Sequence, residues 1–234
     1  MIRKTSHTDR LLQRLDDDPI GNIYPRAILQ GYPRDDAFYR AFEGDDGVVL
    51  TTGHTAYISG AFDKEELRHF LTMLGIKEII YPHKDGNKHI LVYRGSPQTS
   101  TACYAQESDM RGIWQLLCKH FENMPDYRDY YQTKTAQRLY LGGKTAVVRD
   151  GERIASTASV LVCAKDYALL GAVATDTAYR KQGHAGNLLR LLISEVLEHK
   201  KTPLILCDNP IAIHLYKSMG FEEYGKMTVK PYVF

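Results

Sequence analysis

The sequence predicts an α+β fold in which helices flank a mixed central sheet, preceded by a smaller α/β domain. Three observations lead to this prediction. Helix and strand patterns alternate along residues 105–234. Hydrophobic residues make up 44% of the 234-residue chain, which is enough for a packed core. Small and turn-forming residues gather at 94–102, so we expect two domains, 1–98 and 99–234, joined by a loose linker or an exposed strand.

The amino-terminal half predicts the order helix, loop, strands, helix, strands. The stretch GVVLTTGHTAYISG alternates apolar and small polar residues around Gly53, which is typical of a hairpin. DKEELRHFLTMLG has helical spacing, with Asp63 suited to the start and Gly75 to the end. KEIIYP and HILVYRG predict two further strands with HKDGN as their turn.

The residue pattern of the second half predicts the order helix, helix, three strands, helix, strand, helix and closing strands. A helix is expected near Ser108–Glu122, and a tyrosine-rich stretch after it ends at paired glycines. Asp150 and Gly151 predict a hairpin turn, and YALLGAVAT a buried strand. PLILC predicts a strand and PIAIHLYKSMG a helix. GGKT resembles the tail of a phosphate-binding P-loop, but Arg138 stands where its first glycine should be, so we interpret it as a helix cap.

Composition narrows the functional classes. A formal charge of +2 requires neither nucleic acid nor an anionic membrane as a partner. The chain lacks a signal-peptide pattern and an apolar run of about 20 residues, so we expect a soluble, cytoplasmic protein. The four cysteines are far apart, and we expect buried, reduced thiols. The histidines form no H-x-x-x-H pair, and we expect no metal.

The stretch RKQGHAG stands between a predicted strand and a predicted helix. Backbone N–H groups at a helix start carry partial positive charge and bind phosphate. Gly183 and Gly186, with the small Ala185, would let a diphosphate approach the main chain, and Arg180 and Lys181 add charge. The alternative is that Gly183 only eases a turn and that the basic side chains are solvated.

Two motifs in this half resemble the GNAT superfamily of acyl-CoA-dependent N-acyltransferases. The family's diphosphate signature [QR]-x-x-G-x-[GA] is met by Arg180, Gly183 and Ala185, and its later pattern by NPIAIHLYKSMGF. The resemblance covers about residues 105–234. It implies a sheet splayed between the strands that end at Thr175 and Cys207, with acetyl-CoA as co-substrate in the gap. The residues implied to bind it are Val173, Ala174, Thr175, Arg180, Lys181, Gln182, Gly183, His184, Ala185, Gly186 and Asn209.

The resemblance also implies that Tyr216 is the general acid. A phenol stays protonated at neutral pH and can protonate the leaving CoA thiolate, whose pKa is about 8.5 if it is like that of cysteine. A backbone N–H at Val173 would hold the oxyanion. Each residue has an alternative role, because Asn209 before Pro210 is typical of a helix N-cap and Tyr216 lies on an apolar stripe.

The general base is not identified by the sequence. Many family members have a glutamate on the strand that corresponds to LLGAVAT, which here has no carboxylate. Substitutes are His120, Glu122, Asp126 and Asp129, although a solvated surface explains them equally well.

Two functions from different classes remain open. One is acetyl transfer from acetyl-CoA to a small-molecule or protein amine, and the other is a catalytically silent acyl-CoA sensor or scaffold. The amino-terminal half has no second diphosphate signature. It could be a degenerate copy of the same fold, wall off the acceptor pocket or form a homodimer.

Overall fold

The computed structural model describes residues 1–34 and 37–232. The chain divides into two compact units. Unit 1 comprises Met1–Leu91, Leu206–Asp208 and Glu223–Phe234, and unit 2 comprises Val92–Ile205 and Asn209–Glu222. Each unit is an α+β structure with a mixed sheet flanked by helices, so the predicted fold class is confirmed. The boundary at residue 98 stays a prediction.

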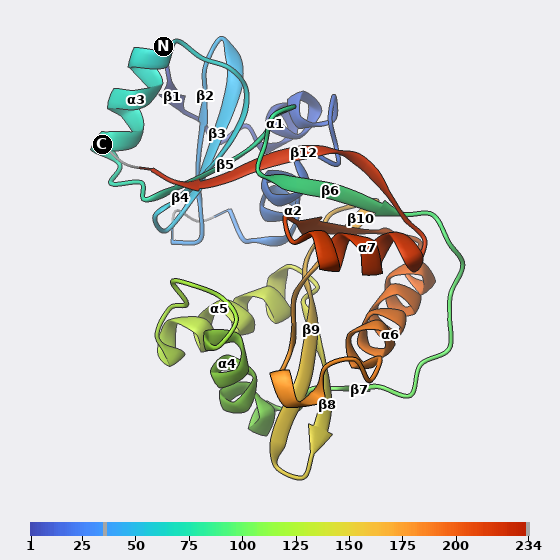
Figure 1. Cartoon of the computed structure of the whole chain (residues 1–234). Coiled ribbons are helices and arrows are strands. Elements are labelled where there is room, and N and C mark those ends of the chain that lie inside the picture. Colours follow the sequence, from blue (N-terminus) through green and yellow to red (C-terminus); the bar gives the residue numbers. More distant parts are fainter. Residues whose placement is uncertain (35–36, 233–234) are drawn as a thin grey trace. The chain divides into compact units, whose positions relative to one another are not determined.

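The first part of the chain supplies most of unit 1 (Figure 1). Its elements are β1 (Arg3–Lys4), α1 (Thr8–Leu15), α2 (Ile23–Gly31), β2 (Arg40–Glu43), β3 (Asp46–Thr52), β4 (Thr55–Ala61), α3 (Lys64–Met73), β5 (Glu78–Pro82) and β6 (Lys88–Tyr93). The strand order in this unit is β1-β2-β3-β4-β5-β12-β6, in which β4 and β5 are parallel. The predicted hairpin at Gly53 and the predicted helix from Asp63 to Gly75 are confirmed.

Alternation along β3 separates two apolar cores in unit 1. Val48 and Leu50 pack with Leu11 and Ile28 from α1 and α2, whereas Val49 packs in a second core with Leu71 from α3. Successive side chains of a strand point to opposite faces of its sheet. The sheet of unit 1 is therefore covered by α1 and α2 on one face and by α3 on the other.

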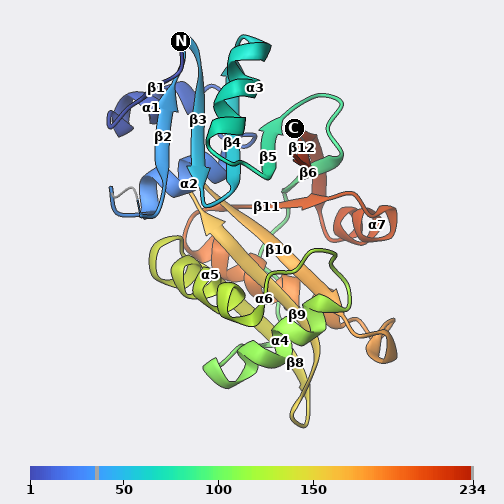
Figure 2. The same ribbon diagram turned by 90° about the vertical axis from the view of Figure 1, so that its left-hand side faces the viewer.

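The rest of the chain forms unit 2 and the last strand (Figure 2). The elements are β7 (Cys103–Tyr104), α4 (Met110–Cys118), α5 (Tyr127–Tyr140), β8 (Lys144–Asp150), β9 (Arg153–Cys163), β10 (Tyr167–Thr175), α6 (His184–Glu198), β11 (Thr202–Cys207), α7 (Pro210–Ser218) and β12 (Phe221–Pro231). Short 3-10 turns occur at Glu107–Asp109 and Thr177–Tyr179. Helices α4 and α5 lie on one face of β8–β10 and α6 on the other.

The two units share an element order. In each, a two-residue strand and two helices precede three antiparallel strands, a crossover helix and a strand that pairs in parallel with the third. In unit 1 the crossover helix is α3, and in unit 2 it is α6. This repetition agrees with the expectation that the amino-terminal half is a degenerate copy of the same fold.

The last strand completes unit 1 rather than standing at the end of unit 2. Residues Met227–Pro231 of β12 pair antiparallel with Glu78–Pro82 of β5. The sequence predicts several closing strands, but residues 221–231 form one long strand.

The segment Arg94–Ala102 forms no strand and is hydrogen-bonded to α6, so neither expected alternative, a loose linker or an exposed strand, describes it (Figure 1). Gln98 N donates to Ser194 Oγ at 3.1 Å, and Ser194 Oγ donates to Gln98 O at 2.9 Å. Ser100 Oγ donates to the Asn187 backbone oxygen at 2.8 Å. A run of small polar residues is compatible both with a flexible linker and with a segment held by hydrogen bonds. Only the partner residues on α6 distinguish these two cases.

We expect Ser194→Ala to speed subtilisin cleavage within residues 94–102. The substitution removes both hydrogen bonds to Gln98, and losing about 1–2 kcal/mol of local stability increases the open population by roughly tenfold. Ser218→Ala is the matched control, because Ser218 Oγ bonds only its own helix at Leu215 O in the described structure. Equal cleavage rates in the two variants would contradict a restraining role for Ser194.

The cysteines differ in part from expectation. All four are free, as predicted, but Cys103 and Cys118 are exposed, Cys163 is partly buried and only Cys207 is buried. Cys118 is the last residue of α4, which ends four residues before Glu122. Apolar neighbours in sequence therefore do not bury a side chain at a helix end or on an edge strand.

Candidate functional site

Strand β10 is interrupted near its end. Gly171 pairs with Ser159 and Ala174 with Thr157, so two residues of β10 oppose one of β9, and Ala172 has a φ of 51°. Such a bulge leaves its extra residue outside the ladder, and a non-glycine residue at positive φ is uncommon. The sequence does not predict this bulge, because alanine and valine carry no signal for it.

The pairing of β10 with its parallel neighbour β11 ends just before the bulge. The pairing with β11 runs from Tyr167–Thr202 to Leu170–Ile205 and extends no further in the described structure. From Gly171 to Thr175 the partner of β10 is β9. The predicted residues Val173, Ala174 and Thr175 thus lie on a part of β10 that is not paired with β11. The splayed sheet that the resemblance implies stays a prediction.

The turn after β10 is built on Asp176, whose side chain is 5% exposed. Its carboxylate accepts hydrogen bonds from Lys119 Nζ at 3.1 Å, from Ala178 N at 3.2 Å and from Arg153 Nη2 at 2.9 Å. These donors hold the pKa of Asp176 well below its usual range, with Lys119 the largest cause. Three charge-assisted bonds fix the direction in which the chain leaves the strand. The sequence alone does not predict this role, because Lys119 and Arg153 are distant from Asp176 along the chain.

We expect Asp176→Ala to lower the melting temperature by about 2–4 °C at pH 7, the usual effect of a modest loss of stability in a chain of this size. A carboxylate with a depressed pKa in the folded state contributes stability above its unfolded pKa of about 3.9 and loses it as the pH falls toward the folded value. The difference in melting temperature between parent and variant should therefore shrink below about pH 4. Thermal melts at pH 7 and pH 3 measure it, and an unchanged difference would contradict the ionised role of Asp176.

The amino-terminal end of α6 has no side-chain cap. Gly183 occupies the N-cap with a φ of 79°, and His184, Ala185 and Gly186 form the first turn, which contains no acidic residue. A Cβ built at Gly183 would meet nothing within 4 Å. The first backbone N–H groups of a helix have no acceptor within the helix. This end is therefore open to an anion, and glycine keeps the approach clear.

The basic residues of the turn differ in position. Lys181, with a φ of 62°, and Gln182 are exposed. Arg180 folds back on the strand, because its Nε donates to Thr175 O at 3.2 Å and its Nη2 lies 3.3 Å from His120 Nδ1. Burial, and then the Arg180 charge, lower the pKa of His120, which favours the neutral imidazole.

The four candidate bases have different surroundings. The structure brings His120 to the turn. Asp126 caps α5 by accepting from Asp129 N at 2.9 Å, which explains its presence structurally. Glu122 and Asp129 are exposed. His120 thus contacts Arg180, one of the residues predicted to bind a diphosphate.

Helix α7 carries the second motif. The Asn209 side chain accepts from Ile211 N at 2.9 Å and Ala212 N at 3.3 Å, so the capping role is confirmed. Tyr216 is 5% exposed, and its ring centroid lies 6.0 Å from that of Phe221. The ring therefore belongs to the core. Contact of Asn209 with acetyl-CoA and acid catalysis by Tyr216 stay predictions.

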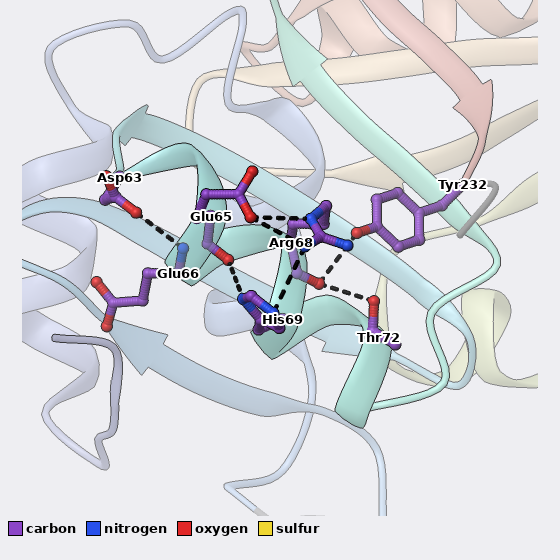
Figure 3. A network of polar contacts seen from close by, with 7 residues as sticks. All are labelled: Asp63, Glu65, Glu66, Arg68, His69, Thr72 and Tyr232. Carbon is purple, nitrogen blue, oxygen red and sulfur yellow. Dashed lines mark hydrogen bonds and ion pairs between the residues drawn. The ribbon is translucent and has the colours of Figure 1, made fainter.

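The equivalent helix end in unit 1 is closed to anions (Figure 3). Asp63 accepts from Glu66 N at 2.8 Å, and Glu65 and Glu66 both lie in the first turn of α3. The capping carboxylate occupies one of the backbone donors, and further carboxylates repel phosphate. Of the two crossover helices, only α6 has an end suited to a diphosphate.

The described residues contain neither a cluster suited to a metal ion nor a helix suited to a membrane. Within 1–34 and 37–232, no group of three or more histidine, cysteine, aspartate or glutamate side chains is arranged to hold a metal ion. No helix in these ranges has the length and apolar character needed to cross a membrane.

Residues 109–221 match the model of the acetyltransferase (GNAT) family. A search of curated proteins found no relative with significant sequence similarity. The matched segment begins at the start of α4 and ends at the start of β12, and contains the bulge, the turn, α6 and α7.

Solved structures of similar fold cover the whole chain at low identity. An acetyltransferase from the GNAT family of Colwellia psychrerythraea is 12% identical, with full coverage of both chains and a TM-score of 0.63. A GCN5-related N-acetyltransferase from Kribbella flavida is 11% identical over 96% of this chain and 95% of its own, with a TM-score of 0.55. A tandem GNAT protein from the clavulanic acid biosynthesis pathway is 12% identical over 99% and 98%, with a TM-score of 0.54. At this identity the likeness shows the fold.

Proposed function

From the match of residues 109–221 to the acetyltransferase (GNAT) family model, we propose that the protein transfers an acetyl group from acetyl-CoA to a primary amine. The observation that carries the proposal is the uncapped end of α6, where Gly183 leaves room for a diphosphate beside unpaired backbone donors. Lys181 and Gln182 flank that end in exposed positions and would add contacts to the phosphates.

In this proposal the pantetheine arm lies along Val173, Ala174 and Thr175. These residues follow the point where β10 leaves β11, so their backbone groups are not paired with that strand. The bulge at Ala172 sets the direction of the next N–H groups, and Val173 N–H would hold the oxyanion as charge develops on the thioester oxygen.

The proposed reaction is a direct transfer. The neutral amine attacks the thioester carbonyl carbon and forms a tetrahedral intermediate. The C–S bond then breaks, Tyr216 donates a proton to the leaving thiolate, and the amine nitrogen loses its proton to water or to a side chain. No side chain is acetylated along the way. Acetyl-CoA is the co-substrate, and the acceptor is a small-molecule or protein amine.

The test is an acetyl-CoA consumption screen over small amines, polyamines, amino acids and peptides, with release of free thiol as the readout. We expect at least one amine class to release thiol in a protein-dependent way, with the acetylated amine identified by mass spectrometry. Binding of acetyl-CoA by calorimetry without turnover on any amine would support the alternative function, an acyl-CoA sensor or scaffold. Absence of binding would overturn both.

A further inference from the structure

A second site of a different kind lies in unit 2. A cavity of about 350 Å³ opens between α5, the start of β8 and the segment from Tyr104 to Glu107. None of the residues predicted to bind acetyl-CoA lines it. Its volume is at the lower end of the range for small-molecule pockets, about 300–1,000 Å³. Its walls include the apolar side chains of Ala105, Met110 and Val160.

One cation in this cavity has no carboxylate beside it. Lys134 from α5 donates to Ser159 Oγ at 3.1 Å, and that hydroxyl is also 2.9 Å from Thr145 Oγ1. The described residues supply Lys134 with no ion pair. Burial lowers the pKa of Lys134 to about 8. Desolvation of a charged amine is unfavourable, and a nearby anion would offset it.

The other ionised groups lining the cavity are already paired. Lys144 forms an ion pair with Glu195, and Arg138 pairs with Glu107. Glu107 also accepts from the Tyr131 hydroxyl, which is the largest cause of its lowered pKa. Both cations are thus balanced by a carboxylate, so Lys134 is the lining cation whose charge a ligand would meet.

A buried acceptor stands on the same helix. Gln137 lines the cavity, and its side-chain oxygen is buried without a hydrogen-bond partner in the described structure. A buried acceptor left unsatisfied is costly, and in native proteins it usually has a partner. Lys134 and Gln137 are three residues apart on α5, so they lie on the same side of the helix.

From these features we propose that the cavity binds a small amphipathic carboxylate that also carries a hydrogen-bond donor. The carboxylate pairs with the Lys134 ammonium, and a short alkyl body contacts Met110 and Val160. The donor bonds the Gln137 oxygen once a rotation of that side chain turns the oxygen from its buried position toward the cavity. This site is separate from the turn before α6, and its occupation does not depend on acetyl transfer.

Three matched probes test the chemistry by calorimetry on the full chain: 2-hydroxyhexanoate, hexanoate, which lacks the hydroxyl, and hexanamide, which lacks the charge. We expect 2-hydroxyhexanoate to bind most tightly and hexanamide to bind about tenfold more weakly or worse, as the loss of a charge-assisted hydrogen bond implies. Lys134→Met should remove the preference for carboxylate over amide. Arg128→Met, an exposed cation lost from the same helix, is the matched control and should keep it.

Proton uptake gives a second readout that needs no variant. Because burial lowers the pKa of Lys134 to about 8, part of the Lys134 side chains are neutral at pH 8, and a bound carboxylate raises that pKa, so binding at pH 8 should take up a fraction of a proton. At pH 6 the uptake should be close to zero. Calorimetry in two buffers of different ionisation enthalpy measures it. The proposal is overturned if hexanoate and hexanamide bind the parent equally, if Arg128→Met loses the preference as fully as Lys134→Met, or if no proton is taken up at pH 8.

Discussion

Tyr216→Phe is expected to lower the rate of acetyl transfer by about a hundred- to ten-thousandfold while leaving acetyl-CoA affinity nearly unchanged. The substitution keeps the ring that packs near Phe221 and removes only the hydroxyl. Loss of a positioned general acid has an effect of this size, and an interaction used only in the transition state lowers kcat without raising KM. Steady-state kinetics with an active amine, repeated across pH, measure the change.

Tyr130→Phe is the matched control for this experiment. Tyr130 is also 5% exposed, and its hydroxyl has no hydrogen-bond partner in the described structure, so its loss should leave turnover unchanged. If Tyr216→Phe retained turnover within a few-fold of the parent, Tyr216 would be a core residue only. The proton would then come from water or from another side chain.

Gly183→Val is expected to weaken acetyl-CoA binding by tenfold or more. A valine adds a branched side chain where the diphosphate approaches the first turn of α6, and it disfavours the positive φ on which the orientation of the turn depends. Calorimetry with acetyl-CoA on the folded variant measures the loss.

A valine at positive φ also destabilises the fold by backbone strain. The control variant must therefore place a valine at positive φ at a site away from α6. Gly53, in the hairpin between β3 and β4, has a φ of 53° and nothing within 4 Å of a built Cβ. Gly53→Val should therefore lower the melting temperature to a similar extent and leave acetyl-CoA binding intact. If both variants, or neither, lost affinity, the turn from Arg180 to Gly186 would not be the binding site.

The sequence predicts the helices and strands of this protein better than the contacts between them. The helix from Asp63 to Gly75 has a capping residue at its start and a glycine at its end, and both signals are local. The tie between Gln98 and Ser194 joins residues 96 positions apart, and no local pattern reveals it. The same limit explains why the burial of Cys103 and Cys118 was predicted wrongly.

In the candidate site, the sequence predicts those features that follow from the identity of a single residue. Glycine at 183 has a left-handed backbone, and asparagine at 209 caps α7, as their identities suggest. The bulge at Ala172, the hydrogen bonds to Asp176 and the position of Lys134 beside Ser159 depend on neighbouring strands and helices. Such features follow from tertiary packing, which a single sequence does not display.

The pairing of β12 with β5 has a consequence for synthesis on the ribosome. Domains generally fold in the order in which they are made, the amino-terminal one first. Here the strand that covers the edge of β5 is translated only after all of unit 2, at Met227–Pro231. Until then the nascent amino-terminal sheet presents an unpaired strand edge, which is prone to wrong association. The first unit to emerge is thus the last to be completed, and a ribosome-stalled chain ending before residue 223 should require chaperone protection that the full-length chain does not.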